Sequence, residues 1–148
     1  MTAFQARIVA EARRWIGTPY VHQCATCGAG TDCLGLLRGV WRALFGPEPE
    51  TIPNYTQDWA EPGGREELLT AAERWLRRKP LVAAAPGDVL LFRMREGRVA
   101  KHLGIAAQIG AEASFVHAYT GHGVIESPLS APWARRIAAR FEFPMGER

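Results

Sequence analysis

The sequence has 148 residues, of which 47% are hydrophobic, and this is enough for one core without disulfide bonds or a structural metal ion. Three cysteines are too few for the disulfide framework of a small secreted domain. The net charge of +3, from 18 basic and 15 acidic residues, is spread along the chain and identifies no anionic partner. We therefore expect a single domain over residues 1–148 whose partners include neither nucleic acid nor a membrane.

The first predicted element is an amphipathic helix near residues 4–16, which Gly17-Thr18-Pro19 ends. The segment is charged at close intervals and contains no apolar run long enough for a signal peptide or a membrane span. We therefore expect the chain to be synthesised in the cytoplasm without a signal peptide. The residues expected on the buried face of this helix are Phe4, Ile8, Val9, Ala12, Trp15 and Ile16.

A second amphipathic helix is predicted to follow a glycine-rich loop and to end before Gly46-Pro47. Thr31 and Asp32 are both good N-caps, so Cys33 stands on the first turn of this helix. Backbone N–H groups have no helical partner there, and the helix end carries roughly +0.5 of a charge. We expect the thiolate to be stabilised, with a thiol pKa below about 8.5 when a cationic histidine is close. The predicted buried stripe is Leu36, Leu37, Val40, Trp41 and Leu44.

Residues 46–64 are rich in proline, glycine and polar residues and predict an irregular segment. Within it, Tyr55 and Trp59 are expected to cover an edge of the core, and the alternative is that they line a cleft. A third amphipathic helix is then predicted, closed by Lys79-Pro80. Its apolar stripe is Leu68, Leu69, Ala72, Trp75 and Leu76.

After Pro86-Gly87-Asp88 the hydrophobic period changes to that of short strands separated by turn residues. Helices come first and strands second, which favours an α+β fold with an antiparallel sheet, because consecutive strands joined by short loops pair as hairpins. Asp88 itself is expected to be a turn and strand-start residue and not a catalytic acid. The predicted strands are V-L-L-F-R-M, H-L-G-I-A-A, S-F-V-H-A-Y, G-V-I-E-S and R-I-A-A-R-F-E-F.

Two histidines are expected to lie together on this sheet, since His102 opens the second strand and His117 lies within the third. A turn around Ile109-Gly110 would place the two residues directly opposite each other. A turn around Gly110-Ala111 would move His117 one pair along and keep it on the same face. Either register brings the two imidazoles within reach of each other, whereas a loop of odd length would separate them.

A cysteine nucleophile needs a histidine to accept its proton, and that base works best when a third polar group holds its ring. Cys33, His102 and His117 can supply these three roles. The alternative is that His22, Cys24, Cys27 and Cys33 bind zinc, although the cluster is compact and would consume the nucleophile. His122 is expected in an exposed turn, with a substrate contact as the alternative.

Five motifs resemble the NlpC-type cell-wall peptidases, a bacterial and phage branch of the papain-like cysteine peptidases. The amino-acid sequence of residues 26–42 is most similar to that of the subgroup encoded in phage and phage-like gene clusters, including gene transfer agents. The resemblance implies a papain-like fold in which N-terminal helices pack on a C-terminal antiparallel sheet. The matching motifs are G-T-P-Y at 17–20, D-C-L-G-L at 32–36, P-G-D-V at 86–89, H-L-G-I at 102–105 and V-H-A at 116–118.

The resemblance also implies a cysteine endopeptidase that cuts an amide bond in peptidoglycan stem peptides, commonly between D-glutamate and the diamino acid, with no cofactor or metal. Carried over by motif, Cys33 is the nucleophile, His102 the general base and then acid, and His117 the residue that orients His102. Tyr20 matches the family tyrosine whose hydroxyl borders the active site. Leu34 replaces a small residue, and V-H-Q after Tyr20 replaces a tryptophan and glycines, so the preferred peptide stays open.

A cell-wall hydrolase without an export signal has to be delivered to its substrate. We therefore expect the chain to be carried in the tail of a virion or phage-like particle, with tail-tip or baseplate proteins as partners, and to act in the periplasm or cell wall. One alternative is a structural tail or baseplate subunit that has this fold and no activity. Another is a cytoplasmic amidase or acyltransferase of the same superfamily.

Overall fold

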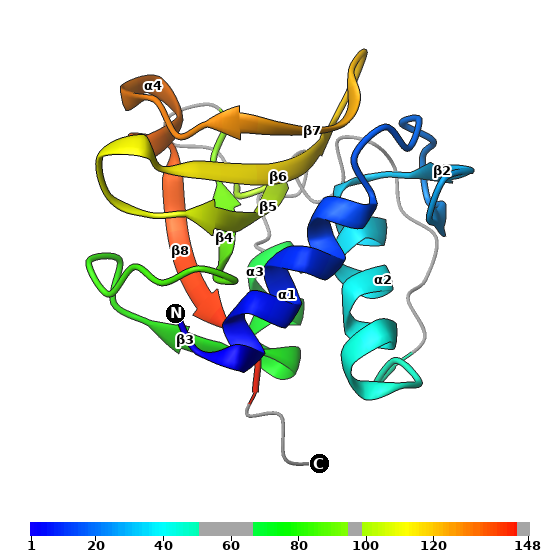
Figure 1. Ribbon diagram of the computed structural model, residues 1–148, viewed down its shortest axis with the longest axis horizontal. Coiled ribbons are helices and arrows are strands. Elements are labelled where there is room, and N and C mark those ends of the chain that lie inside the picture. Colours follow the sequence, from blue (N-terminus) through cyan, green and yellow to red (C-terminus); the bar gives the residue numbers. More distant parts are fainter. Residues whose placement is uncertain (51–66, 95–98, 145–148) are drawn as a thin grey trace.

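A computed structural model describes residues 1–50, 67–94 and 99–144 (Figure 1). Tyr55 and Trp59, which the sequence places at a core edge or a cleft, lie outside the described residues. No helix in the described ranges is long and apolar enough to cross a membrane. The helices are α1 (Ala3–Arg14), α2 (Cys33–Phe45), α3 (Glu67–Trp75) and α4 (Ala131–Ala134), with a short 3₁₀ turn at Gly110–Glu112.

The two N-terminal helices begin where side-chain caps satisfy their first backbone N–H groups. Thr2 and Gln5 form a capping box, in which each side chain accepts the backbone N–H of the other residue. The Asp32 carboxylate accepts the Gly35 N–H at 2.7 Å and so starts α2 at Cys33. That helix ends at Gly46, which has a φ of 89°. The sequence prediction of these two helices is confirmed, except that α1 ends at Arg14 and Ile16, expected on its buried face, is 45% exposed.

The strands form a six-stranded antiparallel sheet in the order β3-β8-β4-β5-β6-β7, beside a two-stranded β1-β2 ladder. Strands β4 to β7 follow one another as hairpins, as the sequence predicts. The last strand returns across α4 to pair with β4, which places β8 inside the sheet. The strands are β1 (Ala25–Thr26), β2 (Gly30–Thr31), β3 (Arg77–Lys79), β4 (Val89–Phe92), β5 (His102–Gln108), β6 (Ser114–Tyr119), β7 (Gly123–Pro128) and β8 (Ile137–Glu142).

The two faces of the sheet carry different cores. Figure 1 shows α1 and α2 next to each other on one side of the sheet, where they bury Leu103, Ile105 and Val116 in the larger core. On the other face a smaller cluster contains Phe92 and Phe115 and is covered by α4. This α+β arrangement of helices on an antiparallel sheet confirms the fold class predicted from the sequence.

The third helix ends earlier than the sequence predicts. It stops at Trp75, and Arg77–Lys79 forms the edge strand β3, which pairs with β8. Pro80 disfavours the helical conformation at the residue before it, so the chain is extended at Lys79. The Lys79 ammonium also contacts the Asp88 carboxylate at 2.9 Å. The helical pattern therefore gives way to an extended segment that the sheet can pair.

Asp88 stands directly before β4 and holds a buried group of charges together. Its carboxylate accepts the Ala85 N–H at 2.9 Å, which closes the turn, and pairs with the Arg140 guanidinium at 2.7 Å. Asp88 is 2% exposed and Arg140 5% exposed, so each charge depends on the other in place of water. These contacts give Asp88 a structural role.

Replacing Asp88 by Asn should lower the free energy of unfolding by about 3 to 5 kcal/mol, because it leaves the Arg140 charge buried without its partner. Urea denaturation measures this loss. The matched control is Glu73→Gln, since Glu73 and Arg78 form a pair in which both side chains are about half exposed. That variant should lose less than about 1 kcal/mol. Losses of equal size in the two variants would contradict a structural role for the buried pair.

Candidate active site

Cys33 is placed by close packing of the α2 N-terminus against the loop that precedes it. Asp32 fixes that loop as well, because its second carboxylate oxygen accepts the Gln23 N–H at 2.7 Å. A side chain at Gly35 would overlap the Cys24 carbonyl oxygen and the Thr31 hydroxyl. The glycine in the D-C-L-G-L motif is therefore needed for the helix to begin so close to the β1-β2 ladder.

The Cys33 thiol lies beside the backbone where β5 begins. It is 9% exposed, and Sγ donates to the Lys101 carbonyl oxygen at 4.0 Å. Burial raises the pKa of the thiol to about 12, and the Asp32 carboxylate acts in the same direction. The N–H groups of Leu103, Leu34 and Cys33 oppose this rise in pKa and do not outweigh it. The prediction of a lowered thiol pKa is therefore wrong for the free protein, because desolvation exceeds the effect of the helix end.

The register of β5 and β6 decides how the two histidines meet. Ile105 pairs with Val116, and this ladder continues to place Gly104 opposite His117. His117 is thus one pair along from His102, as expected for a turn around Gly110-Ala111. A Cβ on Gly104 would lie 3.1 Å from that of His117 and 2.8 Å from the Phe115 ring. The glycine of H-L-G-I makes room for the second histidine.

The two imidazoles form a buried relay of hydrogen bonds. His102 Nε2 lies 2.8 Å from His117 Nδ1, and His117 Nε2 lies 2.9 Å from the Ser127 hydroxyl. Burial lowers the pKa of His102 to about 3, with His117 adding to the effect. It lowers the pKa of His117 to about 4, with a smaller effect from His122. Both rings are therefore neutral at neutral pH.

The thiol and the histidines approach the same pocket from opposite faces of the sheet. Both imidazoles share the face of Phe92 and Phe115, whereas Cys33 belongs to the core under α1 and α2. They come together at the end of the sheet, because Cys33 lies beside the first residues of β5. A cavity of about 530 Å³ is lined there by Cys33 and His102, together with Tyr20, Met94, Lys101, Ala118, Tyr119 and Thr120. His117 lies behind His102.

Tyr20 stands in the wall of this pocket. A parallel bridge between Tyr20 and Thr31 holds it next to the start of α2. Burial raises the pKa of the Tyr20 hydroxyl, and the nearby Cys33 sulfur adds to the rise, while a hydrogen bond with the Thr120 side chain acts against it. Tyr20 is therefore a neutral hydroxyl next to the thiol, able to donate a hydrogen bond into the pocket.

Two residues of this region were not identified from the sequence. Ser127 lies on β7 and ends the histidine relay. Trp133 on α4 packs on the pair, with ring centroids 5.7 Å from that of His102 and 5.2 Å from that of His117. The only signal for Ser127 is its place in a strand that forms a hairpin with the strand of His117. The sequence carries no signal for Trp133, because α4 reaches the histidines only through the tertiary fold.

The other candidate residues lie outside this pocket. Within the described ranges, no group of three or more His, Cys, Asp or Glu residues is arranged to hold a metal ion, so His22, Cys24, Cys27 and Cys33 do not converge. All three cysteines are free thiols, and the exposed Cys27 donates to the Arg14 carbonyl at 3.5 Å. His122 is exposed in the turn before β7 and stacks on the Tyr119 ring.

The lowered histidine pKa values should make the protein less stable in acid. Unfolded histidine has a pKa of 6.5, so below that pH the unfolded chain binds protons that the folded chain does not. The free energy of unfolding is therefore unaffected by the titration of these histidines above pH 6.5. It falls as the pH drops from 6.5 toward the folded pKa values of about 4 for His117 and about 3 for His102. Urea denaturation at pH 7.5 and 5 should show a drop in the free energy of unfolding. In His117→Gln the drop should be smaller by on the order of 1 to 2 kcal/mol, and equal drops would contradict the assignment.

No family model matches the sequence. The chain is 32% identical over 146 residues to the Escherichia coli K12 protein named murein DD-endopeptidase MepS/murein LD-carboxypeptidase. The match covers 92% of this chain and 64% of MepS, so the chain spans less than two thirds of the length of the curated relatives that it matches.

The fold is similar to solved structures of NlpC/p60 domains. The NlpC/p60 domain of the peptidoglycan hydrolase SagA matches with a TM-score of 0.61 and 27% identity, over 95% of this chain and 98% of that domain. An NlpC/P60 family protein from Bacillus cereus matches with a TM-score of 0.65 and 18% identity, over 94% of this chain and 40% of that protein. The chain is therefore similar in sequence to MepS and shares the fold of solved NlpC/p60 domains.

Proposed function

We propose that the chain is a cysteine endopeptidase that hydrolyses an amide bond in peptidoglycan stem peptides, with Cys33 as its nucleophile. The observation that carries the proposal is one pocket in which a thiol on the first turn of a helix meets an imidazole held by a second imidazole. SagA and MepS, which are named as a peptidoglycan hydrolase and a murein peptidase, support the choice of substrate class.

The hydrogen bonds between the rings suit His102 to the role of general base. In one tautomer, His102 Nε2 carries the ring proton and its N–H donates a hydrogen bond to His117 Nδ1. His102 Nδ1 is then unprotonated and can accept the proton of the thiol. His117 Nε2–H then donates to the Ser127 hydroxyl, which completes a consistent set of tautomers. Once His102 is charged, its bond to His117 becomes charge-assisted and stronger.

The reaction starts from a neutral thiol and a neutral imidazole. As the Cys33 sulfur attacks the carbonyl carbon and the C–S bond forms, the thiol proton passes to His102. The carbonyl oxygen takes the negative charge and is stabilised by the Cys33 N–H, which no helical carbonyl accepts, and by the Tyr20 hydroxyl. Each such donor typically lowers the barrier by about 3 to 4 kcal/mol. Proton transfer and attack therefore occur together, and a preformed thiolate is not required.

The second half of the reaction uses the same proton in reverse. His102 protonates the amine as the C–N bond breaks, and an acyl group remains on the sulfur. His102 then takes a proton from water as that water attacks the acyl carbon, and the C–S bond breaks to return the thiol. His117 acts through His102 by holding its ring and by stabilising its charged form.

We further propose that the bond cut joins D-glutamate to the diamino acid, on the basis of the motif resemblance. The name of MepS gives two other activities, those of a DD-endopeptidase and an LD-carboxypeptidase. These three cleavages release different fragments from the same polymer. The mass of the muropeptides released therefore distinguishes the proposed bond from the bonds in the name of MepS.

Cys33→Ala should abolish the release of new amino groups from purified peptidoglycan, a loss of at least about a thousandfold, while its circular dichroism stays that of the parent. Mass spectrometry of the digested muropeptides identifies the bond that the unmodified protein cuts. His102→Ala should lose as much activity as Cys33→Ala, whereas His117→Ala should lose less, because water replaces an orienting group in part.

The control for these variants is Cys27→Ser, because the Cys27 thiol is exposed and does not line the pocket. It should keep full activity. Activity retained by Cys33→Ala would remove the assignment of the nucleophile. Losses of equal size in the two histidine variants would call for a different division of their roles.

We also propose that the chain is delivered to the cell wall on a phage-like tail, where it contacts tail-tip or baseplate proteins. The support for this proposal is the amino-acid sequence of residues 26–42, which resembles that of the phage and gene-transfer-agent subgroup. Particles purified on a density gradient from cells that express the gene should carry the chain in an immunoblot. If the chain is found only in fractions without particles, this mode of delivery is wrong.

A further inference from the structure

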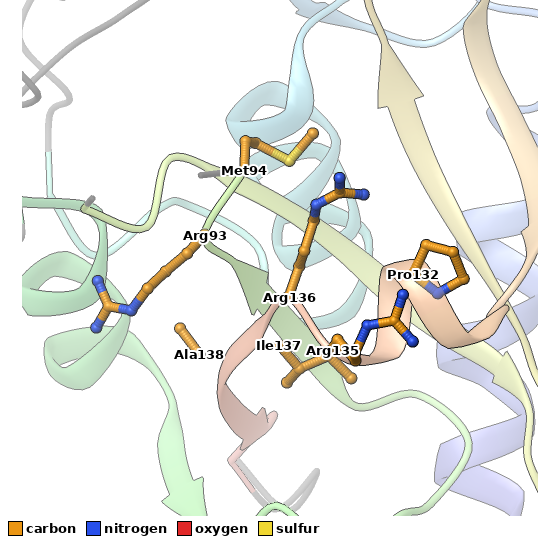
Figure 2. A pocket seen from close by; sticks show the side chains of 7 residues that line it. All are labelled: Arg93, Met94, Pro132, Arg135, Arg136, Ile137 and Ala138. Atoms are coloured by element: carbon orange, nitrogen blue, oxygen red, sulfur yellow. The ribbon is translucent and has the colours of Figure 1, made fainter. Parts of the chain in front are cut away.

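A second cavity, of about 480 Å³, adjoins the active-site pocket and is lined by arginines (Figure 2). It lies between the residues that follow β4, the short helix α4 and the start of β8. Arg93, Arg135 and Arg136 supply its charge, and Met94 is part of its apolar wall. Met94 also lines the pocket that contains Cys33 and His102. The two cavities therefore adjoin at Met94.

The backbone of this cavity, called here the arginine pocket, is held by the fold, whereas the Arg135 and Arg136 side chains are exposed. The Arg93 N–H donates to the Arg136 carbonyl at 2.8 Å, which joins the two sides of the pocket. Figure 2 shows the Arg136 side chain extending toward Met94. The Arg136 guanidinium lies 5.9 Å from the centroid of Trp133, the ring that covers both histidines. The pocket is thus anchored to the same aromatic residue as the histidine pair.

Two of these arginines differ from most of the other arginines in the described ranges. Arg13 pairs with Glu126 at 2.9 Å and Arg38 with Glu48 at 2.8 Å, as is usual for arginines in this fold. Within the described ranges, neither Arg135 nor Arg136 has a carboxylate at ion-pair distance. Arg135 and Arg136 are consecutive, exposed residues, and their like charges repel each other. An anion that enters the pocket relieves this repulsion.

We propose that the arginine pocket is a subsite for a carboxylate of the peptide whose amide bond lies at Cys33. This proposal rests on the proposed function. A D-glutamyl residue linked through its side chain leaves its α-carboxylate free, and a peptide C-terminus carries another. A guanidinium binds a carboxylate through two parallel hydrogen bonds, which fixes its orientation as well as its charge. Arg135 and Arg136 therefore select peptides in the free-acid form over peptides in which that carboxylate is an amide.

Binding is measured by calorimetry on protein that carries Cys33→Ala, so that the peptide is not cut. The probes are a synthetic stem tetrapeptide and copies of it in which one carboxylate at a time is amidated. Amidation of one particular carboxylate should weaken binding at least tenfold. With Arg135→Gln and Arg136→Gln added, the free-acid peptide should bind as weakly as that amide, and amidation should have no further effect.

The matched control is Arg77→Gln, because Arg77 lies opposite Glu142 in the β3-β8 ladder, at the other end of β8, and has the same charge. It should keep the discrimination between acid and amide. Equal binding of all the peptides, or the same loss on amidation with and without the two arginines, would overturn the subsite. Inorganic phosphate and glycerol phosphate are titrated into the same proteins. If they bind only when the arginines are present while acid and amide peptides bind alike, the pocket is a phosphate site and the carboxylate proposal is wrong.

Turnover separates this proposal from the proposed function. In protein that keeps Cys33, the two arginine substitutions should raise KM for the free-acid peptide about tenfold and leave kcat within twofold. They should leave kcat/KM for the amidated peptide unchanged, whereas a merely structural defect would lower it for both peptides. If the unmodified protein cuts no stem peptide, the proposed function fails, and the acid-to-amide difference in binding still decides whether the pocket exists.

Discussion

The contact between the Cys33 thiol and the backbone at the start of β5 is the constraint on which the rest of the site depends. It marks where the N-terminus of α2 meets the sheet, which is the strand position from which His102 projects. Two glycines permit this approach. Gly35 lets the helix begin against the Cys24 carbonyl, and Gly104 leaves space for His117. The motifs around the nucleophile and the histidines are thus packing requirements as well as chemical ones.

Burial gives the site its electrostatic character. The same desolvation that raises the pKa of the Cys33 thiol lowers those of His102 and His117, so all the groups favour their neutral forms. The Cys33 thiol and the His102 imidazole are therefore both uncharged before substrate binds. Hydrogen bonds in such a dry environment are stronger than in water, which favours a precise relay from His102 through His117 to Ser127. The polar relay is stable because each of its ring nitrogens that faces the interior has a partner.

The sheet separates two hydrophobic clusters, one on each of its faces. Its larger core, under α1 and α2, positions the thiol, whereas the smaller aromatic cluster on the other face positions the imidazoles. Trp133 covers that second face, and the Arg136 guanidinium lies over its ring. The short helix α4 therefore links the burial of the histidines to the charged cavity beside them. A segment with little core of its own in this way contributes to both pockets.

The sequence by itself determined the elements that follow from local periodicity. The 3.6-residue stripe after Asp32 placed Cys33 on the first turn of a helix, and the alternation after Asp88 marked the strands that carry both histidines. For a hairpin loop of even length, the two possible turn positions reduced the pairing of the histidines to two registers. Only the tertiary structure selected between those registers, because the 3₁₀ turn at Gly110–Glu112 and the irregularity after Ala106 depend on how the hairpin packs.

Other features were decided by contacts between residues distant in sequence, which leave no local signal. The return of β8 to the side of β4, the change of Arg77–Lys79 from helix to strand, and the approach of Trp133 to the histidines are all of this kind. The pKa of the Cys33 thiol belongs with them. A helix terminus can be recognised in a sequence, but the loss of water around it depends on everything that the fold packs against it.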